Sequence, residues 1–202
     1  MNVVCLDLEG VLVPEIWVNL ADITGVEAFR ATTRDVSDYN ELMTMRLQAM
    51  DEHGLGLADI QSVVARLEPL PGAREFLDGL RADYQVIILS DTFYEFARPL
   101  MAQLGWPTLF CHSLEVTAEG RIADFHIRLE AHKRRSVEAL RGLNFRVVAA
   151  GDSYNDTGML AAAHAGIFYG PPPEIAEQFP QFPVTRDYTE LRGAIDRALA
   201  GA

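Results

Sequence analysis

The sequence of 202 residues contains only two cysteines, Cys5 and Cys111. Two cysteines cannot build a disulfide framework, and both lie in apolar runs, so we expect buried thiols in a reducing compartment. The chain lacks a run of about 18 apolar residues, and we therefore expect no transmembrane helix and no membrane partner. No basic segment precedes the first acidic residues, so we expect no signal peptide. These absences predict a cytoplasmic protein.

Basic residues are also scarce. Lysine and arginine total 17 against 29 aspartates and glutamates, which gives a net charge of −12. A general nucleic-acid binder needs a basic face, so nucleic acid is not an expected partner. A phosphorylated small molecule is compatible with this charge, because a metal ion or a few local cations override the global sign.

Short apolar runs predict strands that are covered on both faces, as in a parallel sheet. These runs cover residues 3–6, 85–90, 108–111, 145–150 and 165–169. Between them lie helical patterns, of which the clearest cover residues 71–82, 93–104 and 133–140. The alternation of strand and helix predicts an α/β fold with a parallel sheet.

Two segments interrupt the alternation. After the first strand, residues 14–69 show only helical periodicity, which predicts an inserted helical cap. Residues 114–128 alternate on both sides of Glu119-Gly120, which predicts a small β-hairpin. We therefore divide the chain into a core of residues 1–13 and 71–202 and a cap of residues 14–70.

Acidic residues follow three of the predicted strands. They are Asp7 and Glu9 after the first, Asp91 after the second, and Asp152 and Asp156 after a later one. The carboxyl ends of parallel strands meet at one edge of a sheet. Two carboxylates about 4 Å apart repel by about 4 kcal/mol at an effective dielectric constant of about 20, so such a group needs protons or a cation.

The composition of this group favours magnesium. It offers only oxygen ligands, which suits Mg²⁺ better than Zn²⁺. Taken alone, Asp152 and Asp156 are also typical of acids at a helix N-terminus. The five histidines show no metal-ligand spacing, so we expect no zinc site.

The pair Asp7-Leu-Glu9 suits covalent phosphoryl transfer. One carboxylate attacks phosphorus, and the second protonates the leaving oxygen and later deprotonates the attacking hydroxyl. Ser90 offers a hydroxyl to a phosphoryl oxygen, and Lys133 offers a compensating cation.

Four motifs in this order resemble the haloacid dehalogenase superfamily of phosphotransferases. They are Asp7-x-Glu9-x-Val11, Ser90, Lys133 and Gly151-Asp-x-x-Asn-Asp156. The resemblance implies a Rossmann-like parallel sheet with a helical cap inserted after the first strand. It also implies a nucleophile at Asp7, an acid/base at Glu9, and Mg²⁺ held by the Asp7 carboxylate, the Glu9 backbone carbonyl and Asp152.

The same resemblance implies roles for further residues. Phosphate or substrate would be held by Ser90, the Asp91 backbone, Lys133 and Asn155, and Asp156 would orient the metal ligands. In the cap, Glu15 and Arg46 match residues that bind the amino-acid end of phosphoserine. Their charges suit this, since glutamate pairs with an ammonium and arginine grips a carboxylate with two donors.

Within the superfamily the sequence is most similar to the phosphoserine phosphatase branch, and there to enzymes that also transfer the phosphoryl group to homoserine. Glu9 departs from the aspartate that most of these phosphatases carry at this position. The implied phosphoryl donor is O-phospho-L-serine, and the implied acceptors are water and L-homoserine. The added methylene of Glu9 does not by itself define the acceptor.

Two other functions are compatible with part of these motifs. A signalling receiver also stores phosphate on an aspartate beside Mg²⁺, but it has no use for a helical insert of this size. A phosphatase of another small metabolite, such as a sugar phosphate, would use the same motifs. Glu15 and Arg46 would then be solvated residues on surface helices. The sequence leaves the oligomeric state, and hence a homodimer, open.

Overall fold

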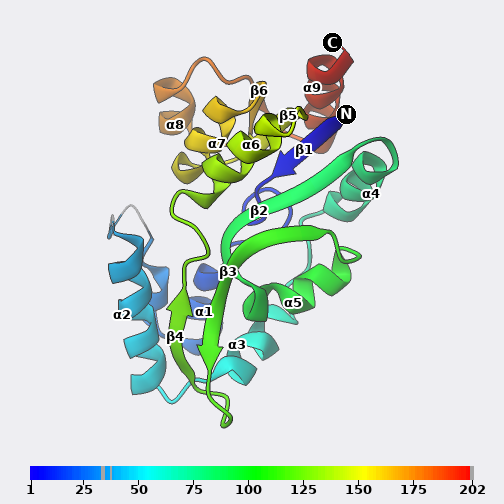
Figure 1. Ribbon diagram of the computed structural model, residues 1–202. Helices are drawn as coiled ribbons and strands as arrows, with labels where there is room; N and C mark the ends of the chain where they lie inside the picture. Colours follow the sequence, from blue (N-terminus) through cyan, green and yellow to red (C-terminus); the bar gives the residue numbers. More distant parts are fainter. Residues whose placement is uncertain (33–34, 37, 201–202) are drawn as a thin grey trace.

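The computed structural model describes residues 1–32, 35–36 and 38–200. Within them, seven strands form one sheet in the order β4-β3-β2-β1-β5-β6-β7 (Figure 1). The strands are β1 Asn2–Leu6, β2 Gln85–Phe93, β3 Thr108–Val116, β4 Ile122–His126, β5 Arg146–Gly151, β6 Ala165–Tyr169 and β7 Val184–Thr185. Every pair is parallel except β3 and β4, which form the predicted hairpin. The parallel α/β fold expected from the sequence is confirmed.

Helices cover both faces of the sheet because successive side chains of a strand point to opposite sides. In β1, Val3 and Cys5 pack with helices α6 His132–Gly142, α7 Thr157–Ala162 and α8 Pro173–Gln178. Val4 and Leu6 belong to the other apolar cluster, with α4 Ala73–Asp83, α5 Tyr94–Gln103 and α9 Tyr188–Ala200. The continuous apolar run of β1 is explained by this double coverage.

The described part of the segment between β1 and α4 contains no strand of the sheet. It contains α1 Ile16–Thr24, the 3-10 helix η1 Glu27–Arg30, α2 Tyr39–Glu52 and α3 Leu57–Val64. In Figure 1 these helices lie below the carboxyl end of the sheet, and the β3–β4 hairpin reaches down to them. The Arg121 guanidinium of the hairpin turn bonds the Asp51 carboxylate of α2 at 2.8 Å, and the Leu57 N–H donates to the Gly120 carbonyl at 2.9 Å.

Two features of the fold differ from the sequence-based expectation. β3 runs without a break through residues 108–116, so one strand serves both the parallel sheet and the hairpin. The edge strand β7 and the helices α7, α8 and α9 had no predicted counterpart. The boundaries of cap and core at residues 14 and 70 stay a prediction.

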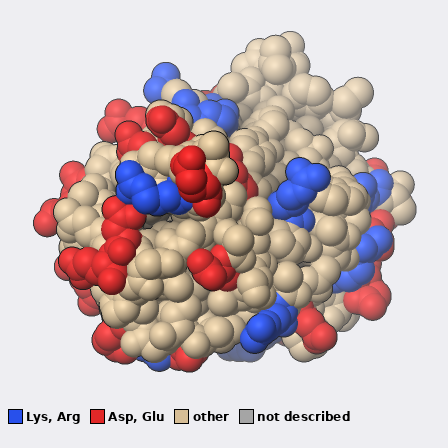
Figure 2. Space-filling model, turned by 90° about the horizontal axis from the view of Figure 1, so that it is seen from below, with Lys and Arg blue, Asp and Glu red and all other residues tan. Residues whose placement is uncertain are grey.

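The surface fits the acidic composition. In Figure 2, acidic side chains gather on one side of the lower face, and basic side chains lie scattered, so this face carries no continuous basic surface. Among the described residues, every helix is too short or too polar to cross a lipid bilayer.

Candidate active site

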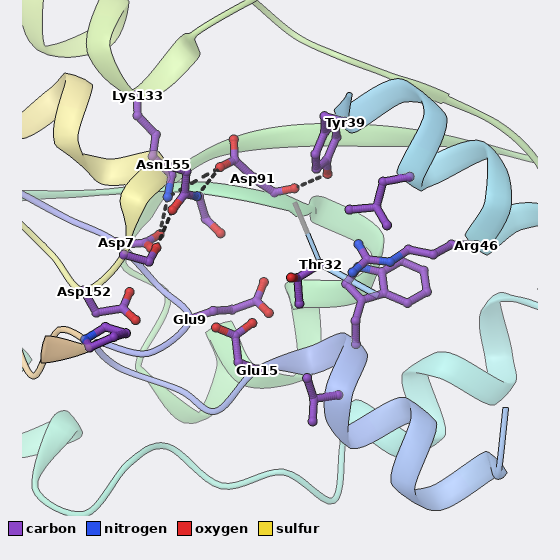
Figure 3. A pocket seen from close by; sticks show the side chains of 16 residues that line it. Asp7, Glu9, Glu15, Thr32, Tyr39, Arg46, Asp91, Lys133, Asp152 and Asn155 are labelled. Atoms are coloured by element: carbon purple, nitrogen blue, oxygen red, sulfur yellow. Dashed lines mark hydrogen bonds and ion pairs between the residues drawn. The ribbon is translucent and has the colours of Figure 1, made fainter. Parts of the chain in front are cut away.

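A cavity of about 420 Å³ lies at the carboxyl end of the sheet, between the strands and the helical segment (Figure 3). Nearly all the site residues expected from the sequence line it: Asp7, Glu9, Glu15, Arg46, Ser90, Asp91, Lys133, Asp152 and Asn155. Asp156 is fully buried and does not line the cavity itself. The convergence follows from the strand order, because β2, β1 and β5 are neighbours and deliver Asp91, Asp7 and Asp152 to one edge.

The Lys133 ammonium is the central cation of this edge. Its Nζ lies 2.8 Å from Oδ1 of Asp7, 2.8 Å from Oδ1 of Asp156 and 3.6 Å from Oδ2 of Asp91. Burial alone would lower the pKa of Lys133, but these three carboxylates outweigh it and hold the pKa well above its usual range. Lys133 therefore stays charged. The Leu8 N–H also donates to Oδ1 of Asp7 at 2.7 Å, which fixes the rotation of that carboxylate.

Two glycines let carboxylates come close to the backbone. A Cβ on Gly10 would lie 2.4 Å from Oδ2 of Asp152, and a Cβ on Gly151 would lie 2.4 Å from Cγ of Asp156. Gly10 also has φ +77°, a conformation that L side chains rarely adopt. Oδ2 of Asp156 accepts the backbone N–H of Asp152 at 3.0 Å, so the buried Asp156 holds the loop that carries Asp152.

A bulge in β2 turns Ser90 and Asp91 toward the cavity. Leu89 pairs with Phe110 and Phe93 pairs with His112, so β2 advances by four residues where β3 advances by two. Such a bulge bends the strand and re-aims its side chains. Oδ2 of Asp91 then accepts from Nδ2 of Asn155 at 2.8 Å, as the dashed line in Figure 3 shows.

Glu9 is tied to the start of α1. Its Oε2 accepts the backbone N–H of Ile16 at 2.8 Å. Burial and the nearby Glu15 carboxylate raise the pKa of Glu9 to about 8. Glu9 is therefore protonated at neutral pH, which suits a general acid.

Arg46 reaches the cavity from α2, across from Glu9 and Glu15 (Figure 3). Its guanidinium carbon lies 4.4 Å from the centre of the Trp17 ring, and Nη2 donates to the Ala31 carbonyl at 2.8 Å. Burial lowers the pKa of Arg46 to about 10. Its Nε is buried and has no hydrogen-bond partner among the described residues. A buried guanidinium with an unused donor is suited to bind an anion.

The carboxylates of Asp7, Glu9, Glu15, Asp91 and Asp152 form an acidic wall of the cavity, which is suited to a divalent metal ion. Five carboxylates but only two basic side chains line the cavity. Oxygens of Asp7, Asp152 and Asp156 lie within 4.8 Å of one another. Burial and the Asp156 charge raise the pKa of Asp7 well above its usual range and that of Asp152 to about 7. A divalent cation between these carboxylates would oppose both effects and hold them ionised, and their hard oxygen ligands fit Mg²⁺.

The sequence did not indicate several residues that the structure places here. Tyr39 donates from its hydroxyl to the Asp91 backbone carbonyl at 2.6 Å, and Trp17 lies against Arg46. His112 and His132, from β3 and α6, both approach the Asp91 carboxylate. These two histidines are 20 positions apart and share no spacing pattern, so the only available signal was that His132 precedes Lys133.

Comparison with known proteins gives consistent matches. Residues 1–164 match the family model of the haloacid dehalogenase-like hydrolases. The phosphoserine phosphatase ThrH of Pseudomonas aeruginosa is 56% identical over 192 residues, which cover 95% of this chain and 94% of that protein. A phosphoserine phosphatase of Pseudomonas syringae pv. tomato is 55% identical, with 95% and 81% covered.

A solved structure shares the fold. It is described as the phospho-aspartyl intermediate analogue of phosphoserine phosphatase, and it superposes with a TM-score of 0.77 over 96% of this chain and 98% of the other, at 21% identity.

Proposed function

Because the chain belongs to the haloacid dehalogenase-like hydrolase family, as its four motifs led us to expect, we propose that it is a magnesium-dependent phosphoserine phosphatase acting through an aspartyl-phosphate. The observation that carries the proposal is one cavity with Asp7, Glu9 and Lys133 on one wall and Arg46 on the other. The first wall suits a phosphoryl group, and the second suits the carboxylate of an amino acid. The names of the relatives support the same substrate.

Asp7 and Glu9 carry out the transfer in two halves. The Asp7 carboxylate attacks phosphorus, the bond from phosphorus to the serine oxygen breaks, and Glu9 gives its proton to that oxygen. Glu9 then takes a proton from water, whose oxygen attacks phosphorus and releases Asp7 and inorganic phosphate. The raised pKa of Glu9, about 8, supports the first half, because the proton is present at neutral pH.

The remaining residues hold the phosphoryl group and the metal. Lys133 offers its charge to the phosphoryl oxygens, and Ser90 and Asn155 offer hydrogen bonds. The Asp7 carboxylate, the Glu9 backbone carbonyl and Asp152 would hold Mg²⁺. When bound, the ion balances the charge of the acidic wall and of the phosphate dianion.

The helical segment supplies the part of the cavity that recognises the amino acid. Arg46 suits the substrate carboxylate and Glu15 its ammonium. Tyr39 joins this segment to the core through the Asp91 carbonyl, and we propose that residues 14–70 act as a cap that excludes bulk water. We place the enzyme in the cytoplasm, which the two buried free thiols of Cys5 and Cys111 support.

Exclusion of water would let a second hydroxyl compete for the aspartyl-phosphate. We propose L-homoserine as that acceptor, since it offers the same ammonium and carboxylate to Glu15 and Arg46 as phosphoserine does. The transfer then balances as the hydrolysis does, with the homoserine hydroxyl in place of water.

One assay tests both activities. The protein is given O-phospho-L-serine and Mg²⁺, with and without L-homoserine, and free phosphate and phosphohomoserine are followed. We expect many turnovers of phosphate release in the wild type and none in Asp7→Asn. Turnover by Asp7→Asn would show that the nucleophile is elsewhere, and one equivalent of bound phosphate without turnover would favour a receiver. If no phosphohomoserine formed, the proposed transferase activity would be refuted and the proposed phosphatase activity would stand.

A further inference from the structure

His132 and His112 lie buried beside Asp91 and do not line the cavity, and the proposed reaction gives them no role. Nε2 of His132 lies 3.0 Å from Oδ1 of Asp91, and Nε2 of His112 lies 3.7 Å from the same oxygen. The two imidazole rings meet edge to face with centres 4.7 Å apart. The other oxygen of Asp91 faces Asn155 and Lys133 at 2.8 Å and 3.6 Å. Asp91 thus connects the histidines to two groups of the cavity.

Arg128 determines where the imidazole protons lie. Its Nη2 lies 3.4 Å from Nδ1 of His132, and its backbone N–H donates to Nδ1 of His112 at 3.3 Å. A guanidinium and a backbone N–H are donors only, so we assign both Nδ1 atoms as unprotonated acceptors. In this tautomer each imidazole directs an Nε2–H at the Asp91 carboxylate. Burial lowers the pKa of His132, which agrees with a neutral ring.

The same tautomers argue against a metal ion at this place. Ligand atoms of Asp91, His112 and His132 lie within 4.8 Å of one another, a grouping that can hold a metal. Coordination through Nε2 would move the ring protons to Nδ1, where they would face the two donors of Arg128. The geometry therefore favours hydrogen bonds to Asp91.

We propose that His132, oriented by Arg128 and packed against His112, is a positioning residue that fixes the Asp91 carboxylate and, through it, the Asn155 amide and the Lys133 ammonium at the cavity. This inference rests on the proposed phosphatase function. The local backbone supports it, because Ala131 precedes α6 as its N-cap with φ +49°, and the next two residues, His132 and Lys133, are both buried. The bulge in β2 brings Asp91 to meet them.

The kinetic test compares His132→Leu with His132→Gln. Leucine removes the donor, whereas the glutamine side chain can place an N–H near the position of Nε2. We expect His132→Leu to lower kcat/KM by about 10-fold to 100-fold, as for a lost hydrogen bond to a charged group. The loss should be equal for phosphoserine and 4-nitrophenyl phosphate, because Asn155 and Lys133 serve the phosphoryl group. His132→Gln should recover most of it. The exposed His126, changed to Gln, is the matched control and should stay at the wild-type rate.

A double-mutant cycle distinguishes positioning from a general loss of structure. If His132 acts through Asp91, His132→Leu should have little further effect in an Asp91→Asn background. The proposal would be overturned if the losses in kcat/KM of the two single variants multiplied in the double variant. It would also be overturned if His132→Leu kept the wild-type rate, or if His132→Gln were as slow as His132→Leu. Melting temperatures of the same variants show whether any loss reflects unfolding.

Long-range ¹H–¹⁵N correlation of the histidine rings gives a readout that needs no activity. We expect protonated Nε2 and unprotonated Nδ1 for His112 and His132, and a shifted Asn155 side-chain amide in His132→Leu. Protonated Nδ1 atoms, or ring signals that change on adding Zn²⁺, would overturn the network. A wild type that does not hydrolyse phosphoserine would overturn the proposed function instead, while the ring signals and the 4-nitrophenyl phosphate rates would still decide the network.

Discussion

Replacement of Arg46 by alanine separates recognition of the amino acid from the chemistry on phosphate. Arg46 is 6% exposed, and its Nε has no hydrogen-bond partner among the described residues. A carboxylate in the cavity can pair with two N–H groups of the guanidinium in a planar pair of bonds. The Trp17 ring, 4.4 Å from the guanidinium carbon, keeps the fork in place. Substrates that lack a carboxylate gain nothing from this arrangement.

The magnitude follows from the kind of bond lost. Hydrogen bonds to charged groups contribute about 1.5 to 3 kcal/mol, which corresponds to about 10- to 150-fold in kcat/KM. We therefore expect Arg46→Ala to reduce kcat/KM for phosphoserine by that factor, chiefly through KM. Arg46→Lys keeps the charge but loses the planar fork, so it should fall between alanine and wild type.

The assay measures kcat and KM for O-phospho-L-serine, O-phosphoethanolamine and 4-nitrophenyl phosphate. Phosphoethanolamine keeps the ammonium and lacks the carboxylate, so Arg46→Ala should change its kcat/KM little. Arg66, an exposed arginine of the same helical segment, provides the control when it is changed to alanine. Equal losses on all three substrates would refute the assignment, because they would show that Arg46 supports the cavity as a whole.

Three further predictions concern the metal site and the core. Gly10→Ala should lower activity and the affinity for Mg²⁺, since the added Cβ would meet Asp152 at 2.4 Å; Gly25→Ala, with a similar positive φ but open space, is the control in a Mg²⁺ titration. The pKa of Glu9 is raised from 4.5 to about 8 in the metal-free fold, so Glu9 binds its proton more tightly when folded. Metal-free protein should therefore lose stability as pH rises from about 5 to about 8, and Mg²⁺ should raise the melting temperature more at pH 8 than at pH 6; a flat pH dependence would contradict this. Burial raises the pKa of the Cys5 thiol to about 12, so a disulfide reagent that reacts with thiolates should label this cysteine only after unfolding. The absorbance of the group that the reagent releases measures the labelling.

The position of the acidic wall was predictable from the sequence for a simple physical reason. Continuous apolar runs predict parallel strands, and neighbouring parallel strands end at the same edge. Asp7, Asp91 and Asp152 follow such runs, so their convergence required no knowledge of side-chain contacts. We expected Lys133 as a compensating cation, but the strand argument does not place it, because a helical pattern does not show that a residue at its start turns toward a sheet edge.

The surroundings of Asp91 were not predictable in this way. They depend on two extra residues in β2 relative to β3, and a bulge leaves no mark in the apolar pattern of a strand. They also depend on His112 and His132, which lie on different elements and meet only in the folded chain. The strand β7, two residues long, is too short to show any periodicity.

The surroundings of Lys133 explain how an acidic protein can present a cation to a phosphoryl group. Three carboxylates hold its ammonium, two of them at 2.8 Å, so the side chain is charged and oriented before any substrate enters. A group that is already in place need not reorganise during the reaction, which is the main source of electrostatic catalysis. Asp91 is the carboxylate of these three that also meets His132 and Asn155. Its burial acts to raise its pKa, but Lys133 and the histidines outweigh this and hold the pKa well below the usual range. Asp91 therefore stays ionised. It accepts the Asn155 amide at 2.8 Å through one oxygen and faces both histidines through the other, and it adds the third negative charge around Lys133.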